Sequence, residues 1–499
     1  MDIKLPENIT AVVSDERKLQ EGCLFICCPI TNYNGSASII KAIRAGAAVI
    51  VAEKGMYEEA LEASGMTEKE FLGDRPPRIR FVEDARYAMA FLYAAWYDHP
   101  ARKMITIGIT GTKGKTTVSY MIYEMLKEAG YKVGLIGTVE YIIGDEHIDS
   151  YLTSPEADIL QEFMFRMAEQ GTQVVVMEVA SQALMTHRSQ GFVFDIGVFT
   201  NIGEDHIGPD ECHDFEHYVY CKSLLMRQCK TGIINIDDPY VDDILKGHSC
   251  EVKTYGICKK ADLRAANISH LLIRGVPGVE FDVESFAAQS DSLPESSLHI
   301  RMPMPGSYSV SNALAAICAV RQLSVPDKDI VNVLERIYVK GRMNIIKPEQ
   351  ADEKHLPTMI VDFAHNPMSL RALLMTLRTH YSGKIIIVFG SVPPRDFTLV
   401  GEVCGELADM TVITMDNWTK EDPMTIMKAI EGGVKKVAGK CVIIPDRSQA
   451  VSYAVSVAGP DDVVVVAGRG HQNYQMINGK VVPFPSDEEL LLSACRSDE

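Results

Sequence analysis

The segment from Ile105 to Gly134, "ITIGITGTKGKTTVSYMIYEMLKEAGYKVG", most narrows the folds open to this chain. An apolar run ends at Thr110, glycines follow at 111 and 114, and apolar residues then recur at helical spacing from 118 to 126. A strand, a glycine loop and a helix in this order present backbone N–H groups and a positive helix end, which bind phosphate. The segment therefore predicts a phosphate-binding loop on a parallel sheet.

The loop departs from the usual phosphate-binding pattern at one position. Gly114-Lys115-Thr116 is present, but Ile109 occupies the place of the first glycine. In such loops the lysine contacts the β- and γ-phosphates and the next hydroxyl binds Mg²⁺. We assign these roles to Lys115 and Thr116. A helix start that is merely rich in Gly and Thr is the alternative.

Apolar runs that alternate with helical stretches predict an α/β fold with parallel sheets. A length of 499 residues suggests about three domains at roughly 150 residues each. We expect a small α/β domain at 1–97, a central domain with a doubly wound parallel sheet at 98–336, and a Rossmann-like α/β domain at 337–499. Alternating residues between about 255 and 305 predict antiparallel strands attached to the central domain.

Charge, hydropathy and cysteine usage exclude several classes of protein. The formal charge of -18 argues against a nucleic-acid-binding surface, which needs an excess of Lys and Arg. The chain start resembles no signal peptide, and no apolar run approaches the roughly 18 residues of a membrane helix. We therefore expect a cytoplasmic protein without a membrane partner. The 12 cysteines form no C-x-x-C pair and predict buried thiols.

The loop "TGTKGKTT" resembles that of the Mur ligases, which lack the first glycine and use ATP to join an amino acid to a cell-wall precursor. Further blocks that resemble this family follow in the family's order over nearly the whole chain. They are "LTSPEA", "MEVASQALMTHR", "TNIGEDHIG", "YCKSLLM", "PGSYSVSNALAA", "KGRMNII", "VDFAHNPMSL", "DNWTKEDP" and "AGRGHQNYQ".

The blocks are most similar to those of the family members that add the third peptide residue. The resemblance implies a monomeric ATP-dependent amide ligase of peptidoglycan synthesis. It would add a diamino acid such as L-lysine to UDP-N-acetylmuramoyl-L-Ala-D-Glu through an acyl phosphate. A divergent ligase with another acceptor or amino acid, and a noncatalytic nucleotide-binding relative, are the alternatives.

The resemblance also implies the residues that bind ATP and two Mg²⁺ ions. By pattern alone, Glu178 is a strand-end acid that suits a metal but equally suits solvent, and Lys222 is an ordinary helix lysine. The resemblance makes Lys222 a carbamylated metal ligand. Its metal set is Thr116, Glu178, His206 and Lys222, and its ATP set is Gly111, Thr112, Lys113, Gly114, Lys115, Thr116, Thr117, Asn312, Arg342, Asp362 and His365.

The substrate residues follow the family less closely. The implied set is Thr153, Ser154, Ser181, Arg188, Arg395, Asp416, Asn417, Gly468 and Gln472. The departures are Glu16 and Ser36 in the uridine-binding segments, Ala180 for a serine and Thr186 for a glutamine. "DNWT" replaces the D-N-P-R of diaminopimelate-adding members, so the Arg that pairs with the distal carboxylate is missing. The pattern favours lysine or another diamino acid, although Gln472 replaces a Glu that would contact an ammonium group.

The stretch from His206 to Cys221 contains zinc-ligand residue types. His213, His217 and Cys212 lie between them. Their spacing fits no standard zinc pattern. We therefore expect surface and capping roles for His213 and His217.

Overall fold

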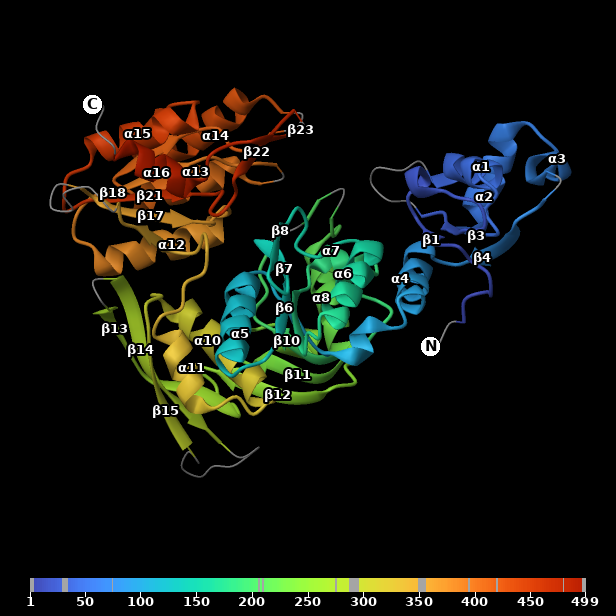
Figure 1. Ribbon diagram of the computed structural model, residues 1–499. Helices are drawn as coiled ribbons and strands as arrows, with labels where there is room; N and C mark the ends of the chain where they lie inside the picture. Colours follow the sequence, from blue (N-terminus) through green and yellow to red (C-terminus); the bar gives the residue numbers. More distant parts are fainter. Residues whose placement is uncertain are drawn as a thin grey trace. The chain divides into compact units, whose positions relative to one another are not determined.

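The computed structural model describes residues 4–28, 35–73, 75–204, 207–208, 211–273, 276–286, 296–348, 356–393, 395–418, 421–478 and 480–495 (Figure 1). Two compact units are present: residues 1–264, 285–296 and 311–330 form unit 1, and 265–284, 297–310 and 331–499 form unit 2. Parallel strands and intervening helices confirm the predicted α/β class. The division into three domains stays a prediction, and His206 lies outside the described residues.

The first sheet of unit 1 has the order β1-β2-β3-β4, and every pairing is parallel. Leu24 and Ile26 of β2 join one apolar cluster, whereas Phe25 joins another, as expected where alternate residues face opposite sides of a sheet. Both faces of this small sheet are therefore covered. Its elements are β1 (Val12–Val13), η1 (Glu16–Lys18), β2 (Leu24–Ile26), α1 (Gly35–Arg44), β3 (Val49–Glu53), α2 (Lys54–Ser64), α3 (Glu68–Leu72), β4 (Arg78–Val82) and α4 (Ala85–Trp96).

The large sheet has the order β15-β14-β13-β12-β11-β10-β5-β9-β6-β7-β8. From β12 to β6 its pairings are parallel, so the loops after β5, β9 and β10 meet at one edge. Its elements are η2 (Pro100–Lys103), β5 (Ile105–Thr110), α5 (Lys115–Glu128), β6 (Val133–Ile136), β7 (Glu140–Ile143), β8 (Glu146–Asp149), α6 (Ala157–Glu169), β9 (Val174–Glu178), α7 (Ser181–Met185), β10 (Phe194–Phe199), α8 (Phe215–Arg227), β11 (Cys229–Asn235), α9 (Val241–Ile244), β12 (Glu251–Gly256), β13 (Leu263–Ile273), β14 (Val276–Ser285), β15 (Ser296–Met302), α10 (Ser307–Arg321) and α11 (Asp327–Leu334).

The antiparallel hairpin β7–β8 is a feature that we did not predict. Ile143 pairs with Glu146 across a two-residue turn, and Gly144 there has φ +61°, which a glycine adopts readily. A Gly-Asp pair between two short alternating runs was the available signal. The hairpin extends the parallel sheet beyond β6.

The sheet of unit 2 has the order β16-β17-β21-β18-β19-β20, with only β16 antiparallel to its neighbour. The carboxyl ends of β17, β21, β18 and β19 therefore share one edge. A small β22–β23 ladder accompanies it. The elements are β16 (Asn344–Ile346), β17 (Thr358–Asp362), α12 (Pro367–His380), β18 (Ile385–Phe389), α13 (Phe397–Leu407), β19 (Met410–Ile413), α14 (Pro423–Lys436), β20 (Cys441–Ile443), α15 (Arg447–Val457), β21 (Val463–Ala467), β22 (Tyr474–Ile477), β23 (Lys480–Pro483) and α16 (Asp487–Ala494).

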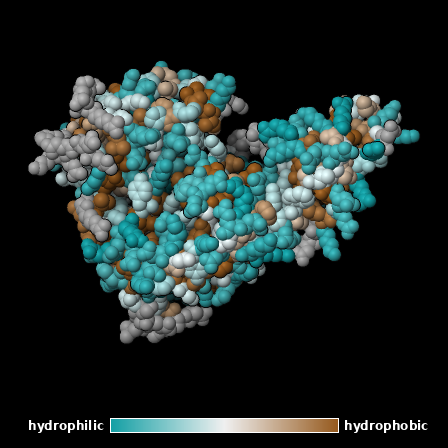
Figure 2. Space-filling model, in the orientation of Figure 1, coloured by the Kyte–Doolittle hydropathy of each residue, from teal (hydrophilic) through white to brown (hydrophobic). Residues whose placement is uncertain are grey.

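Polar residues dominate the surface. On the face drawn in Figure 2, hydrophobic residues lie in separate patches among hydrophilic ones. Among the described residues, no helix combines the length and apolar character that crossing a membrane requires.

Candidate nucleotide and substrate site

The glycine loop is closely surrounded by other elements of unit 1. Gly111 has φ +148° and Gly114 has φ +88°, a backbone region that favours glycine. A Cβ on Gly111 would lie 1.9 Å from Thr200 Oγ1, and one on Gly114 would lie 2.3 Å from Asn312 Oδ1. Asn312 of α10 is thus placed beside the loop, as the sequence suggested. Side chains at these two positions would fill the cradle, so the glycines are a steric necessity.

The missing first glycine has a structural explanation. Ile109 lies inside β5, fully buried, and pairs with Val198 and Glu178 of the neighbouring strands. The chain leaves the strand only at Thr110, so the turn begins later than in the common pattern. A β-branched residue suits that strand position.

Two lysines converge on the carbonyl of Gly111. Lys115 Nζ donates to Gly111 O at 2.8 Å and to Thr112 O at 3.3 Å. Lys222 Nζ, from α8, donates to the same oxygen at 2.9 Å and lies 4.6 Å from the ring centroid of Tyr218. Lys222 is only 1% exposed. Two ammonium groups at a loop of backbone N–H groups create a strongly positive site for an anion.

Glu178, at the end of β9, is the acid of this site and is fully buried. Its Oε2 accepts hydrogen bonds from Thr116 Oγ1 at 3.0 Å and Thr138 Oγ1 at 2.9 Å, and its Oε1 accepts one from Thr138 N at 2.9 Å. Thr116 and Glu178 therefore offer oxygen atoms side by side, which are the donors that Mg²⁺ prefers. The sequence analysis did not identify Thr138.

Thr153 and Ser154 lie next to this acid. Thr153 Oγ1 is 3.0 Å from Thr138 Oγ1, and Ser154 Oγ donates to Glu178 O at 2.8 Å. Arg188 donates to Ser154 O at 3.2 Å and forms an ion pair with Glu156 at 2.9 Å. Burial lowers the pKa of Arg188, and the negative charge of Glu156 opposes that shift. The expected acceptor residues are thus linked to the expected metal ligands.

The remaining predicted residues of unit 1 have local partners. Thr112 Oγ1 is 3.1 Å from Tyr218 OH, and the backbone N–H of Lys113 donates to Asn201 Oδ1 at 3.0 Å. Thr117 and Ser181 are both buried near the starts of α5 and α7.

The positions that depart from the family pattern also have local partners. Ala180 N donates to Ser154 Oγ at 3.0 Å, and Thr186 Oγ1 donates to Gln182 O at 2.7 Å. Glu16 accepts from Ser38 at 2.7 Å and from Lys41 at 2.6 Å, and these two contacts lower its pKa. Ser36 lies in α1, which also contains Ser38 and Lys41.

In unit 2, Arg342, Asp362 and His365 surround Phe363. The guanidinium of Arg342 lies 4.6 Å from the ring centroid of Phe363, and the ring of His365 packs against it edge to face at 5.0 Å. Asp362 accepts backbone hydrogen bonds from Met343 at 2.8 Å and from Ala364 at 2.7 Å. An aromatic and cationic surface of this kind suits the stacking of a flat ring.

The predicted amino-acid residues meet at the same sheet edge of unit 2. Gly468 follows β21 with φ +110°, and a Cβ there would lie 3.1 Å from Asp416 Oδ2. Asn417 Nδ2 is 3.4 Å from Gln472 Oε1. Arg395 follows β18, and its Nη1 donates to Val392 O at 3.2 Å. The structure brings Asp416, Asn417, Gly468 and Gln472 together, and Thr419 lies outside the described residues.

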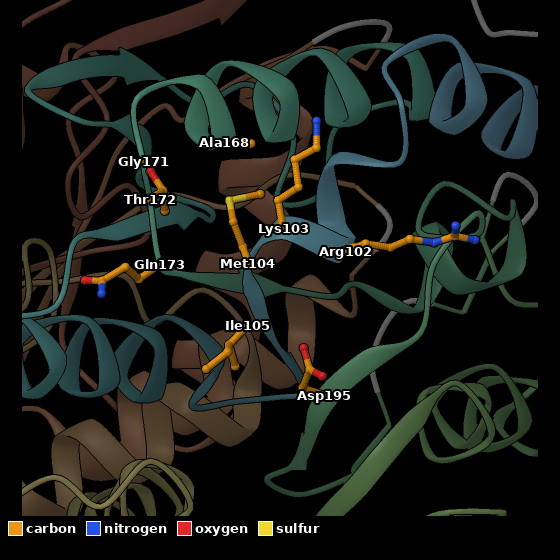
Figure 3. Close-up of a pocket in the computed structure, with 9 residues that line it drawn as sticks. All are labelled: Arg102, Lys103, Met104, Ile105, Ala168, Gly171, Thr172, Gln173 and Asp195. Carbon is orange, nitrogen blue, oxygen red and sulfur yellow. The ribbon is translucent and has the colours of Figure 1, made fainter.

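A separate pocket of about 560 Å³ lies at the opposite end of the large sheet. Ile105 and Gln173, at the starts of β5 and β9, line it together with Lys103 and Asp195 (Figure 3). The glycine loop follows the other end of β5. None of the predicted site residues lines this pocket.

Comparison with known proteins places these features in a family. Residues 109–320 match the Mur ligase middle domain, and residues 341–470 match the glutamate ligase domain of Mur ligases. The chain belongs to the Mur ligase family. It is accordingly an ATP-dependent ligase.

Relatives of this Mur ligase match along nearly its full length. It is 36% identical over 485 residues to the UDP-N-acetylmuramoyl-L-alanyl-D-glutamate–2,6-diaminopimelate ligase of Caldanaerobacter subterraneus subsp. tengcongensis, covering 96% of this chain and 94% of that one. The enzyme of the same name from Bacillus licheniformis is 33% identical, with 96% and 93% covered. A solved structure of a ligase with this name has a TM-score of 0.65 at 26% identity, with 99% and 96% covered. The fold is also that of Thermotoga maritima MurF, solved in complex with ADP, with a TM-score of 0.61 at 18% identity and 98% of both chains covered.

Proposed function

We propose that this Mur ligase uses ATP and Mg²⁺ to add a diamino acid, as the third peptide residue, to UDP-N-acetylmuramoyl-L-Ala-D-Glu. The observation that carries the proposal is the convergence of Lys115 and Lys222 on Gly111 O, beside the buried Thr116–Glu178 pair. The names of the relatives in Caldanaerobacter and Bacillus support this acceptor.

The chemistry requires activation of a carboxylate. An oxygen of the acceptor carboxylate attacks the γ-phosphorus of ATP, ADP leaves, and an acyl phosphate forms. The amine then attacks the acyl carbon, an amide bond forms and inorganic phosphate leaves with the carboxylate oxygen. Two anions must approach each other in the first step, so Lys115 acts by neutralising charge and by fixing the phosphate position.

The residues present fit a metal-bound nucleotide. Gly111 and Gly114 keep the cradle open, and Thr116 and Glu178 offer adjacent oxygen donors. Bound Mg²⁺ would neutralise phosphate charge and orient the transferred group. We propose that Thr116, Glu178, His206 and Lys222 hold two such ions. Glu178 is kept in place by Thr138, which occupies both of its oxygens.

Carbamylation of Lys222 would change the electrostatics of the site. Unmodified, Lys222 and Lys115 are two cations that donate to one carbonyl oxygen, and like charges at such short range repel. When the neutral Lys222 amine adds to CO₂ and loses a proton, it becomes a carbamate anion whose remaining N–H can still donate to Gly111 O. The pair with Lys115 then becomes attractive, and two oxygen donors are added.

The amino acid is best described as L-lysine or a related diamino acid. Asp416, buried next to Gly468, suits an ammonium group, and Arg395 suits the α-carboxylate. The segment from Asp416 to Trp418 and the neutral Gln472 provide no guanidinium for a distal carboxylate. We therefore expect weaker use of meso-diaminopimelate than of L-lysine.

The experiment is a product screen by mass spectrometry with phosphate release in parallel. Purified protein, ATP and Mg²⁺ are incubated with the UDP-muramoyl dipeptide and with L-lysine, L-ornithine, meso-diaminopimelate or L-alanine. We expect an ATP-dependent tripeptide product, with L-lysine preferred. Activity only with another carboxylate acceptor would instead support a divergent ligase, and nucleotide binding without product for any acceptor would support a noncatalytic protein.

A further inference from the structure

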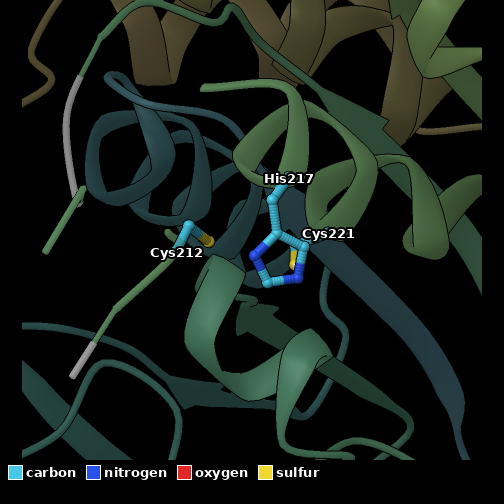
Figure 4. Close-up of side chains that lie close together, drawn as sticks. All are labelled: Cys212, His217 and Cys221. Carbon is cyan, nitrogen blue, oxygen red and sulfur yellow. The ribbon is translucent and has the colours of Figure 1, made fainter. Parts of the chain in front are cut away.

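A cluster of two thiols and one imidazole lies on α8 and on the segment that precedes it. Cys212, His217 and Cys221 each offer one ligand atom, and these three atoms all lie within 4.8 Å of one another. His217 and Cys221 are four residues apart on α8, so both project from one helix face. Cys212 reaches them from the segment before the helix (Figure 4). We call these three residues the thiol–imidazole cluster.

The dimensions of the cluster suit a small tetrahedral ion. Cys221 Sγ lies 3.4 Å from His217 Nε2. With Zn–S near 2.3 Å and Zn–N near 2.0 Å, tetrahedral ligands lie about 3.5 to 3.8 Å apart. The three atoms already lie close to these separations, so an ion requires only small side-chain movements.

The three side chains are not committed to other hydrogen bonds of the kind that bury ordinary thiols. Cys27 Sγ, for comparison, donates to Gly35 O at 2.7 Å. His217 Nδ1 is buried and has no hydrogen-bond partner among the described residues. Both cysteines of the cluster are nearly inaccessible to solvent, at 2% and 1% exposed. Burial raises the pKa of Cys221 to about 12, so that thiol is protonated until an ion displaces its proton.

The chain offers an internal comparison for this cluster. Cys229 and Cys250 are a second pair of buried cysteines in contact, and their side chains hydrogen bond to each other. No imidazole or carboxylate joins that pair to make a ligand group among the described residues. Two close thiols therefore occur twice in unit 1, but a three-ligand set occurs once in the part of the chain that the structure describes.

We propose that Cys212, His217 and Cys221 bind one thiophilic divalent ion of the zinc class, with the fourth coordination position open to water. Two sulfurs and one imidazole nitrogen select such an ion over Mg²⁺, which prefers oxygen. The ion ties the segment at Cys212 to α8 directly before Lys222. The sequence spacing did not predict the site, because its ligands combine one helical repeat with a residue brought in by the fold.

The test uses Co²⁺ as a spectroscopic probe in the full-length, reduced protein after removal of metals by chelation. Thiolate coordination gives a charge-transfer absorption band that oxygen ligands do not give, so binding at a Mg²⁺ site does not interfere. We expect the band to saturate at one ion per chain and to disappear when Zn²⁺ is added. The variants Cys212→Ser, Cys221→Ser and His217→Gln should each weaken binding by about 10-fold or more. The matched controls Cys229→Ser and Cys258→Ser should retain it.

A second measurement avoids the question of whether a variant folds. In the wild-type protein, Zn²⁺ should slow alkylation of Cys212 and Cys221 by about 10-fold or more, read peptide by peptide, and leave Cys229 and Cys250 unchanged. Absence of a thiolate band, survival of the band in Cys212→Ser and Cys221→Ser, or equal protection of Cys229 would overturn the proposal. Ligase activity with Mg²⁺ is assayed separately, so failure here leaves the proposed function standing.

Discussion

The glycine-loop region of unit 1 and the carboxyl edge of the unit 2 sheet differ in how their side chains are held. In unit 1, Glu178 accepts three hydrogen bonds between 2.9 and 3.0 Å and is fully buried. In unit 2, Gln472 makes only two long side-chain contacts, each of 3.4 Å, to Asn417 and Tyr474. The first region resembles a preorganised charge site, which phosphoryl transfer needs. The second region can be altered more easily, which suits a choice among amino acids.

The largest expected effect comes from the centre of the charge site. Lys115→Ala removes an ammonium group from the loop, and we expect the rate of product formation to fall by about 10³-fold. Lys127→Ala, on the exposed end of the same helix, is the matched control and should change the rate little. Equal loss in both variants would mean that α5 is merely destabilised, which circular dichroism would detect.

The backbone beneath the unit 2 edge should be as rigid as that of unit 1, although its side chains are less constrained. Arg447 and Asp487 form a fully buried pair with contacts of 2.7 and 2.8 Å, and Arg447 also donates to Ala467 O at 3.0 Å, next to Gly468. Asp487→Ala strands a buried cation, so we expect a loss of about 3 to 5 kcal/mol in the free energy of unfolding.

The control for that variant is the exposed pair Arg371–Glu406. Arg371→Ala should cost at most about 1 kcal/mol. Urea unfolding monitored by circular dichroism measures both variants. A loss for Asp487→Ala as small as that for Arg371→Ala would show that the buried pair does not stabilise this edge.

A smaller effect is expected from the residue that positions Glu178. Thr138→Val removes one of the hydroxyl donors to Glu178 without touching the glycine loop, and it should weaken Mg²⁺ binding by about 10-fold. Titration of the rate against Mg²⁺ should therefore give a higher half-saturating concentration, with the maximal rate restored at high Mg²⁺. A fall in the maximal rate alone, with unchanged Mg²⁺ dependence, would argue against this positioning role.

The smallest expected effect lies in the amino-acid pocket. Gln472→Glu introduces a carboxylate where the pocket is neutral, so the KM for L-lysine should fall by about 3- to 10-fold while the KM for ATP stays constant. L-ornithine should show the same direction of change. An unchanged KM for both diamino acids would place their side chains away from residue 472.

The sequence predicted the parts of the fold whose signals are local. The glycine loop, the strand-end Glu178 and the apolar strands of both sheets follow from short patterns, and the structure has strands and helices in these places. Thr138 was missed because its partner Glu178 is 40 residues away, and a lone threonine after a strand has no distinctive pattern. The thiol–imidazole cluster was missed for a related reason, since only the fold brings Cys212 to His217 and Cys221.

Site roles required more than pattern. Lys222 looks like any amphipathic-helix lysine, and only the family resemblance suggested a special role for it. The structure then places its ammonium group on Gly111 O. Arg342 and His365 are equally ordinary in sequence, and their common packing around Phe363 depends on the turn after β17. Their contacts with ATP stay predictions.

Transfer of an oxygen isotope tests the central claim most directly, because the claim is that the charge site activates a carboxylate by phosphorylation. The UDP-muramoyl dipeptide is prepared with ¹⁸O in the γ-carboxylate of its D-Glu and is incubated with ATP, Mg²⁺ and L-lysine. The account predicts that each inorganic phosphate released with the amide product contains one ¹⁸O atom, read by mass spectrometry. Amide product accompanied by unlabelled phosphate would contradict an acyl phosphate and, with it, the role given to Lys115 and Glu178.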